Sequence, residues 1–155
     1  MKYQLYREQQ LQCDIDTAWR FFSNPKNLSK ITPKDMGFTV LSNYTDSEIF
    51  EGMIIDYTVS PFLNIPLNWQ TKIIQVEKNK SFTDFQEKGP YKFWNHYHEF
   101  IPNENGVLMR DTVDYELPLG FLGTIAHRLF VKNKLEIIFN YRYAVLDKFF
   151  NHKKI

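Results

Sequence analysis

The C-terminal stretch constrains the fold most, because it predicts one long helix that follows a run of strands. No proline occurs from Phe121 to Phe150. Apolar residues recur through this stretch at helical spacing, and they are Leu122, Ile125, Leu129, Leu135, Ile138, Val145 and Phe149. We therefore predict a single helix of about 28 residues, which is about 42 Å long at 1.5 Å per residue.

The residues before this helix predict strands that are joined by short turns. The candidate strands are Tyr3–Cys13, Phe38–Ser42, Glu48–Phe50, Met53–Ser60, Leu67–Glu77, Ser81–Gln86, Tyr91–Ile101 and Gly106–Leu117. Short connections between consecutive strands favour an antiparallel meander. After the first strand, Asp14 and Asp16 are candidate caps of a helix that Asn24-Pro25 ends. Residues 26–31 then predict a second short helix.

This order of elements predicts an α+β protein, in which an antiparallel sheet carries helices on one face. No linker rich in proline, glycine and serine divides the 155 residues, so we expect one domain over residues 1–155. A long helix that crosses a strongly curved sheet cannot stay in contact with it along its whole length. A cavity between helix and sheet is therefore expected.

Composition and charge narrow the class of partner. Lys+Arg 19 against Asp+Glu 18 gives a net charge of +1, so no large field is available to hold a nucleic acid. No apolar run approaches the roughly 20 residues that span a bilayer. The N-terminus lacks the apolar region of a signal peptide, and we expect a cytoplasmic protein. The aromatic share is 17%, and the expected partner is a small hydrophobic molecule; the sequence predicts no particular oligomeric state.

Several candidate strands place aromatic and polar side chains on the same face, because side chains alternate along a strand. Trp94, His96, His98 and Phe100 share one face of their strand. A plain hydrophobic core needs few polar groups, so this pairing indicates a lined pocket. The candidate ligand-binding residues are Trp69, Asp84, Gln86, Trp94, His96, His98, Phe100, Asp111 and Tyr115, with Phe139 and Tyr143 from the long helix.

A sequence pattern on the last strands resembles a known family. The pattern is Phe82-x-Asp84-x-Gln86-x-x-Gly89-Pro90-Tyr91-x-x-Trp94-x-His96-x-His98-x-Phe100, followed by Asp111-x-Val113-x-Tyr115-x-Leu117-Pro118-x-Gly120-x-x-Gly123. It is similar to the bacterial ligand-binding branch of the SRPBCC (START-like, polyketide cyclase/dehydrase-like) superfamily, and the resemblance extends over the whole chain.

The resemblance implies a helix-grip fold. In this fold a seven-stranded curved antiparallel sheet wraps around the long C-terminal helix, with two short helices after the first strand. Members of the superfamily bind lipids, polyketides, hormones or quinones in a deep apolar cavity, and some are cyclases. The superfamily is functionally broad, so the resemblance identifies a fold better than an activity.

The two histidines raise the question of a metal site. His96 and His98 project from the same strand face, and Asp111 offers a carboxylate on the next strand. The alternative is that both imidazoles hydrogen-bond to Asp84, Asp111 or Gln86 and line a cavity. A His-x-His pair without a third convincing ligand is a weak signal. We therefore predict no metal and no cofactor.

The same groups also fit acid–base chemistry, with His96, His98 and Asp111 as candidate catalytic residues and Tyr115 to polarise a carbonyl group. The sequence contains neither a nucleophile motif nor a cofactor motif beside them, which favours a polar network that shapes the pocket. The leading hypothesis is a carrier of a small hydrophobic or aromatic ligand. A cyclase/dehydratase-type enzyme and a protein-interaction module stay open as alternatives.

Two apolar segments are candidates for the rim of the cavity, although plain packing explains them equally well. They are the loop 61–66, bounded by prolines, and the segment 121–123 at the start of the long helix. The basic residues of that helix are interleaved with acids and predict a solvated face. They are Lys132, Lys134, Arg142 and Lys148.

Overall fold

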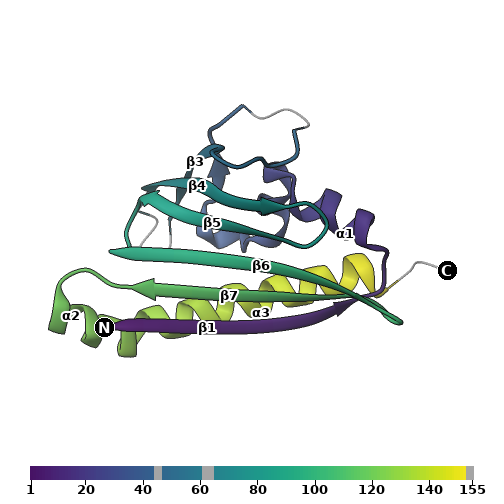
Figure 1. The fold of residues 1–155 in the computed structure, drawn as a ribbon. Coiled ribbons are helices and arrows are strands. Elements are labelled where there is room, and N and C mark those ends of the chain that lie inside the picture. Colours follow the sequence, from purple (N-terminus) through teal and green to yellow (C-terminus); the bar gives the residue numbers. More distant parts are fainter. Residues whose placement is uncertain (44–46, 61–64, 153–155) are drawn as a thin grey trace.

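A seven-stranded antiparallel sheet curves around the C-terminal helix, as the computed structural model of the chain shows (Figure 1). The structure describes residues 1–43, 47–60 and 65–152. The strands are β1 Lys2–Leu11, β2 Thr39–Val40, β3 Ile54–Val59, β4 Leu67–Glu77, β5 Ser81–Lys88, β6 Phe93–Asn103 and β7 Gly106–Glu116. The helices are α1 Ile15–Phe22, the 3-10 helices Pro25–Ile31 and Lys34–Met36, α2 Gly120–Ala126, the π-helical turn His127–Val131 and α3 Lys132–Phe150. The predicted helix-grip fold is confirmed.

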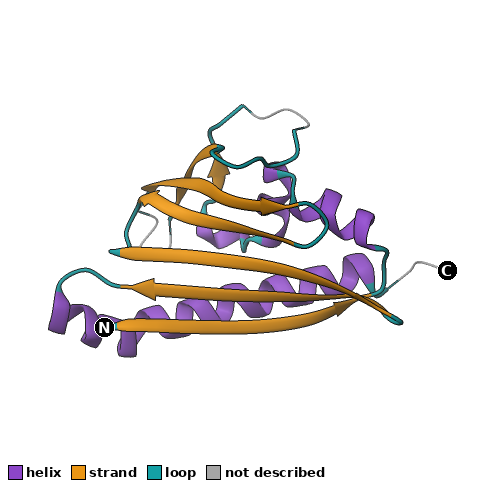
Figure 2. Cartoon of the chain, viewed as in Figure 1, coloured by secondary structure: helices purple, strands orange, loops and turns teal. Residues whose placement is uncertain are grey.

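The sheet order places the first strand of the chain next to the last strand. The strands follow the order β1-β7-β6-β5-β4-β3-β2, and every neighbouring pair is antiparallel. Among the described strands, only the pairing of β1 with β7 departs from a simple meander, and it sets Leu5 opposite Val113. The described helices lie on one side of the sheet, with α3 crossing behind β7 and β1 (Figure 2). This α+β layering leaves the concave face to the helices.

The predicted C-terminal helix is confirmed and is continuous from Gly120 to Phe150. Its ladder of hydrogen bonds changes within the five residues of the π-helical turn, which periodicity did not predict. Single π turns inside α-helices are frequent at functional sites. This one holds His127 in a buried position. Among the described residues, no helix is both long enough and apolar enough to cross a membrane.

The segment between β1 and β3 contains one more helix and one strand fewer than predicted. Asp14 caps α1 as expected, accepting a hydrogen bond from the Thr17 backbone N–H at 2.8 Å. A third short helix, Lys34–Met36, follows the two predicted ones. The prediction of a strand over Glu48–Phe50 is wrong, because the Ile49 N–H donates to the carbonyl of Ser23 rather than to a neighbouring strand.

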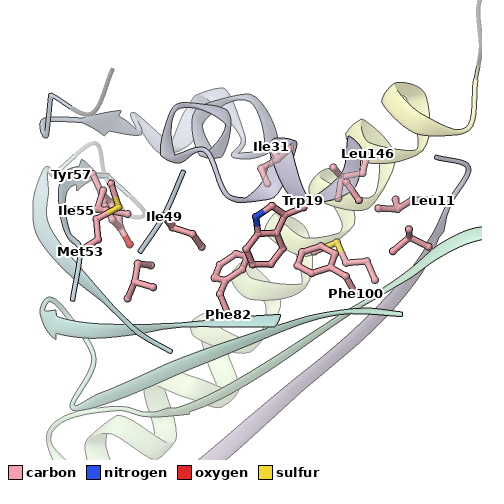
Figure 3. Packing of buried hydrophobic residues seen from close by; sticks show 14 residues of the cluster. Leu11, Trp19, Ile31, Ile49, Met53, Ile55, Tyr57, Phe82, Phe100 and Leu146 are labelled. Carbon is pink, nitrogen blue, oxygen red and sulfur yellow. The ribbon is translucent and has the colours of Figure 1, made fainter. Parts of the chain in front are cut away.

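The larger hydrophobic cluster lies where α1 packs against the sheet (Figure 3). The Trp19 indole is 2% exposed and meets the rings of Phe82 and Phe100 edge-on, at centroid distances of 6.0 and 5.9 Å. Leu146 of α3 belongs to the same cluster. Truncating a ring as buried as Trp19 to Ala costs about 3–5 kcal/mol. This cluster holds α1 and the end of α3 in place, and part of it also lines the cavity on the concave face.

Candidate functional site

A cavity of about 320 Å³ lies between the inner face of the sheet and the C-terminal helix. Its lining comes from β3, β4, β5 and β6, from α3 and from the 3-10 helix Pro25–Ile31. Strand alternation accounts for the lining, because β6 buries every second side chain from Trp94 to Phe100. The volume is near the lower end of the roughly 300–1,000 Å³ typical of ligand pockets.

Aromatic rings form much of the cavity wall. Trp69 of β4 and Trp94 of β6 meet edge-to-face with centroids 5.3 Å apart, and Tyr57 of β3 stacks on Trp69 at 5.8 Å. Phe139 faces them from α3 and is 4% exposed. The sequence placed Trp69, Trp94 and Phe139 at the cavity, and they lie there. Their contact with a ligand stays a prediction.

The wall also contains a hydrogen-bond donor that is not satisfied by the described residues. The indole Nε1 of Trp69 is buried and has no hydrogen-bond partner in that part of the chain. A buried donor without a partner costs about 1–3 kcal/mol. Such a cost is commonly repaid when a ligand supplies the acceptor.

Four polar residues on β5, β6 and β7 form a closed cluster beside the cavity. Asp84 pairs across the strands with His96, and His98 pairs with Asp111. Asp111 Oδ1 lies 2.9 Å from His96 Nε2 and 2.8 Å from His98 Nδ1, the second contact being too bent for a regular hydrogen bond. Asp84 Oδ2 lies 2.8 Å from His98 Nε2 and 3.6 Å from His96 Nδ1. Each imidazole therefore lies between two carboxylates.

The cluster shifts the pKa of each of its members. Burial favours neutral carboxyl groups, but the contacts with both imidazoles outweigh it and hold the pKa values of Asp84 and Asp111 below the ordinary value. Burial also opposes charge on His98, yet its two carboxylate neighbours outweigh burial and raise its pKa. For His96, burial and the neighbouring His98 prevail and lower the pKa. His98 therefore holds its proton to a higher pH than an ordinary histidine, and His96 loses its proton at a lower pH.

Asp84, His96 and His98 line the cavity, whereas Asp111 lies behind them. Two carboxylates and one imidazolium give the cluster a net charge of −1. The neutral His96 presents Nδ1 on the side of Asp84, since its Nε2 is engaged by Asp111. This arrangement can polarise a ligand, accept a proton or bind a cation, because Asp84, His96 and His98 offer ligand atoms within 4.8 Å of one another.

Arg142 is a cavity residue that the sequence analysis assigned to a solvated face, and that prediction is wrong. Its side chain is 8% exposed, lines the cavity and lies over the Phe139 ring at 4.9 Å from the centroid. Its Nε has no hydrogen-bond partner among the described residues. The buried α3 positions Leu135, Phe139, Arg142 and Leu146 follow helical spacing, so the arginine was detectable as one position of the inward stripe.

Tyr115 lies in a second buried pair that the sequence did not reveal. Its hydroxyl group lies 2.9 Å from His127 Nε2, and the Tyr3 ring stacks on that imidazole at 3.5 Å. Burial raises the pKa of Tyr115 to about 12. Burial, with Lys132 and Arg128 nearby, lowers the pKa of His127. Tyr115 does not line the cavity, and this pair attaches the π-helical turn to the sheet.

The other predicted site residues lie away from the cavity. Phe100 packs under Trp19 in the main hydrophobic cluster. Gln86 donates to the Tyr91 carbonyl at 2.7 Å and accepts from its N–H at 3.3 Å, so it holds the turn between β5 and β6. Tyr143 is 49% exposed on the outer side of α3, one residue beyond the inward stripe. None of the three is among the residues that line the cavity.

The two predicted rim segments have different outcomes. Positions 61–64 of the proline-bounded loop lie outside the described residues. At the start of the C-terminal helix, Phe121 and Leu122 do not line the cavity and are more than half exposed. Leu129 and Phe130 are exposed to a similar degree. This apolar segment suits the protein-interaction hypothesis and lies next to cavity residues Leu117 and Val131.

Comparison with solved structures shows that the fold of this chain also occurs in other proteins. Protein CV1439 from Chromobacterium violaceum superposes with a TM-score of 0.71 at 10% identity, over 97% of this chain and 99% of that chain. The protein TTHA0849 from Thermus thermophilus gives 0.68 at 13% identity, over 96% and 95%. No protein-family model matches the sequence, and no curated protein matches it.

An enzyme is also among the similar structures. Norcoclaurine synthase from Thalictrum flavum, in complex with dopamine and hydroxybenzaldehyde, gives a TM-score of 0.64 at 16% identity. The match covers 100% of this chain and 90% of that chain. At these identities the likeness shows a shared fold and no more.

Proposed function

We propose that the chain binds a small hydrophobic or aromatic molecule in the cavity, and that this molecule carries a hydrogen-bond-accepting group. The observation that carries the proposal is a largely apolar cavity that is lined by two residues, each with a buried donor that has no partner among the described residues. These donors are Trp69 Nε1 and Arg142 Nε. The enclosed apolar wall supplies affinity, and the donors supply orientation.

The apolar wall accounts for most of the expected affinity. A ligand that buries about 250 Å² of apolar surface gains roughly 6 kcal/mol at 25 cal/mol per Å², before the cost of association is subtracted. Rings such as Trp94 and Phe139 also offer stacking surfaces to an aromatic ligand. Since about 6 kcal/mol corresponds to a Kd of about 40 µM even before that cost, we expect simple aromatic compounds to bind no more tightly than tens of micromolar.

The polar residues select the class of ligand. Arg142 is a buried cation with no ion pair to a carboxylate of the described residues, and the negative Asp84 lies on the opposite wall. A ketone, quinone or carboxylate oxygen satisfies the guanidinium group, and a hydroxyl group on the same ligand satisfies Asp84. A hydrocarbon of equal size leaves the buried Nε of Arg142 without an acceptor and adds no hydrogen bond to Asp84, so it binds more weakly.

Thermal-shift titration with matched ligand pairs tests the proposal. Each pair contrasts an aromatic or acyl compound that carries a carbonyl or carboxylate group with its hydrocarbon analogue. We expect the oxygenated member to raise Tm and the analogue to raise it less. Native mass spectrometry of the protein after mild purification identifies any molecule that is retained. A flat response to both members of every pair rejects the proposal.

A pair of substitutions on neighbouring helix positions provides the control. Ile138 lines the cavity, whereas Ile137 is 49% exposed on the same helix. Ile138→Trp fills the cavity and should abolish the ligand-induced rise in Tm. Ile137→Trp adds the same side chain outside the cavity and should leave the rise unchanged. If the ligand raises Tm equally in both variants, the ligand binds outside this cavity.

A second candidate function is an acid–base enzyme of the cyclase/dehydratase type, and the neutral, cavity-lining imidazole of His96 favours it. A base whose pKa lies below its ordinary value is unprotonated at pH 7 and able to accept a proton. With a ligand recovered from the native protein, turnover should collapse in His96→Gln while binding persists. Turnover that is unaffected in both His96→Gln and His98→Gln rejects this function.

A further inference from the structure

The cluster of two histidines and two aspartates divides into an inner set and an outer carboxylate. Asp84, His96 and His98 line the cavity, and Asp111 lies behind the imidazoles on β7. The sequence alone offers Asp111 as a possible third ligand, and because a His-x-His pair without a convincing third ligand is a weak signal, it predicts no metal. The structure brings a different carboxylate, Asp84, to the cavity side of both imidazoles.

We propose that Asp84, His96 and His98 bind a divalent transition-metal ion at the cavity wall, with Asp111 orienting the two histidines. Each of the three residues offers one ligand atom, and these atoms lie within 4.8 Å of one another. The ring nitrogens that contact Asp84 Oδ2 are His96 Nδ1 and His98 Nε2. The proposal stands on this cluster alone and does not depend on the hydrophobic ligand.

The distances suit such an ion after small rotations of the side chains. Ligand atoms bound at about 2.0–2.1 Å in tetrahedral geometry lie about 3.3 Å apart. Asp84 Oδ2 lies 3.6 Å from His96 Nδ1 and 2.8 Å from His98 Nε2, one value on each side of that spacing. Neither contact differs from it by more than several tenths of an ångström.

Asp111 has the placement of an outer-shell carboxylate. Metal-bound histidines usually donate their second ring N–H to a carboxylate or carbonyl group, which fixes the ring orientation. Asp111 Oδ1 lies 2.9 Å from His96 Nε2 and 2.8 Å from His98 Nδ1, which are the ring nitrogens on the far side from Asp84. One carboxylate thus contacts both rings, with a regular hydrogen bond to His96 only, and leaves the other nitrogen of each ring on the side of Asp84.

Charge and access favour an ion of charge +2. A bound ion takes the place of the proton on His98. It then faces two carboxylates and two neutral imidazoles, which carry −2 and which a divalent cation neutralises. Two histidines and one carboxylate are a ligand set of zinc hydrolases and of iron(II) oxygenases, in which the remaining coordination positions stay open. Here the open positions face the cavity, because all three ligands line it.

Titration of the full-length protein with Zn²⁺, after treatment with EDTA and dialysis, tests the proposal. Isothermal calorimetry should give one ion per chain with Kd of about 1 µM or tighter. His96→Gln and Asp84→Asn should each weaken binding at least about 100-fold, and Asp111→Asn about 10–100-fold with the stoichiometry retained. His127→Gln is the matched control, since it removes a buried histidine outside the cluster, and should leave Kd unchanged.

Two further measurements keep the result independent of variant folding. X-ray absorption of the zinc-loaded wild-type protein should show two imidazole ligands, and bound Co²⁺ should give visible absorption bands that EDTA removes. His152→Gln checks the exposed His152–Asp147 pair near the C-terminus, and this variant should retain full affinity. The proposal is overturned by the absence of 1:1 binding, by a zinc environment without imidazole, or by binding that is lost only in His152→Gln.

Discussion

Replacing Asp111 with Asn separates the charge of the buried cluster from its shape. The side chain keeps its size and one acceptor oxygen but loses the negative charge that contacts His96 and His98 at 2.9 and 2.8 Å. A hydrogen bond to a charged group contributes about 1.5–3 kcal/mol, against about 0.5–1.5 kcal/mol between neutral groups. With one hydrogen bond to His96 and a second close charge contact with His98, Asp111→Asn should lower the free energy of unfolding by about 2–3 kcal/mol at pH 5.5.

The pH dependence of this difference tests the electrostatic reasoning. The pKa of Asp111 is depressed in the folded protein, so its stabilising contribution is fully present above the unfolded carboxyl pKa of about 3.9 and is lost as pH falls toward the folded pKa. The difference in free energy of unfolding between wild type and Asp111→Asn should therefore narrow below about pH 4, by up to about 1.4 kcal/mol per pH unit. On the alkaline side the gap should also narrow above about pH 6.5, where His98, whose folded pKa is raised, begins to lose its proton.

Urea unfolding at several pH values between 3 and 8, with EDTA present throughout, measures the gap. A loss of about 2–3 kcal/mol corresponds to about 4–12 °C in Tm for a chain of this size. Asp114→Asn on the opposite face of β7 is the matched control, since it weakens one hydrogen bond from Gln4 at 2.9 Å near the surface. A gap that stays constant from pH 5.5 to pH 3, or two variants of equal stability, would refute the reasoning.

Three further substitutions test the packing around the site. Gly106→Ala should lower the free energy of unfolding by about 3 kcal/mol or more in urea unfolding, because a Cβ there would lie 2.2 Å from a backbone carbonyl oxygen. Gly52→Ala is the control, since Gly52 also has a positive φ but open space around it, and it should cost only about 1–2 kcal/mol. Phe139→Ala should lower the free energy of unfolding by about 3 kcal/mol and enlarge the range of accepted ligands. This is the lower end for a buried ring, because the cavity already borders Phe139. Phe149 is 57% exposed on the same helix, so Phe149→Ala should cost under about 1 kcal/mol and change no ligand response. Tyr115→Phe leaves a buried imidazole without its hydroxyl partner and should lower stability by about 1–3 kcal/mol in calorimetry, so a neutral result would show that this hydrogen bond contributes nothing.

Much of the fold follows from periodicity in the sequence. The alternation along β6 and β7 predicted which side chains point inward, and His96, His98 and Asp111 are buried accordingly. The 3.6-residue period predicted the C-terminal helix. The strand predicted over Glu48–Phe50 failed because three residues with one buried position carry too little pattern to separate a strand from a docked loop.

The site was predictable only in part, because its remaining features depend on neighbours across the fold. Asp84 and His98 were identified as inward-facing, yet their 2.8 Å contact depends on the register between β5 and β6. Arg142 was assigned to solvent from its charge, and only its position on the stripe of Leu135 and Phe139 indicated otherwise. The π-helical turn has no periodic signal of its own, since it interrupts the period that identifies the helix.

The pairing of β1 with β7 also has a consequence for synthesis of the chain. Gln4 and Asp114, which are hydrogen-bonded across these strands, are 110 positions apart. At about 5–20 residues per second, a ribosome needs roughly 6–22 s to extend the chain from the first of them to the second. During that interval the edge of β1 has no partner, and the helix that closes the cavity is made later still. Folding of this domain is therefore expected to finish only after its C-terminal helix has been made, and to be slow, since its pairings span nearly the whole chain.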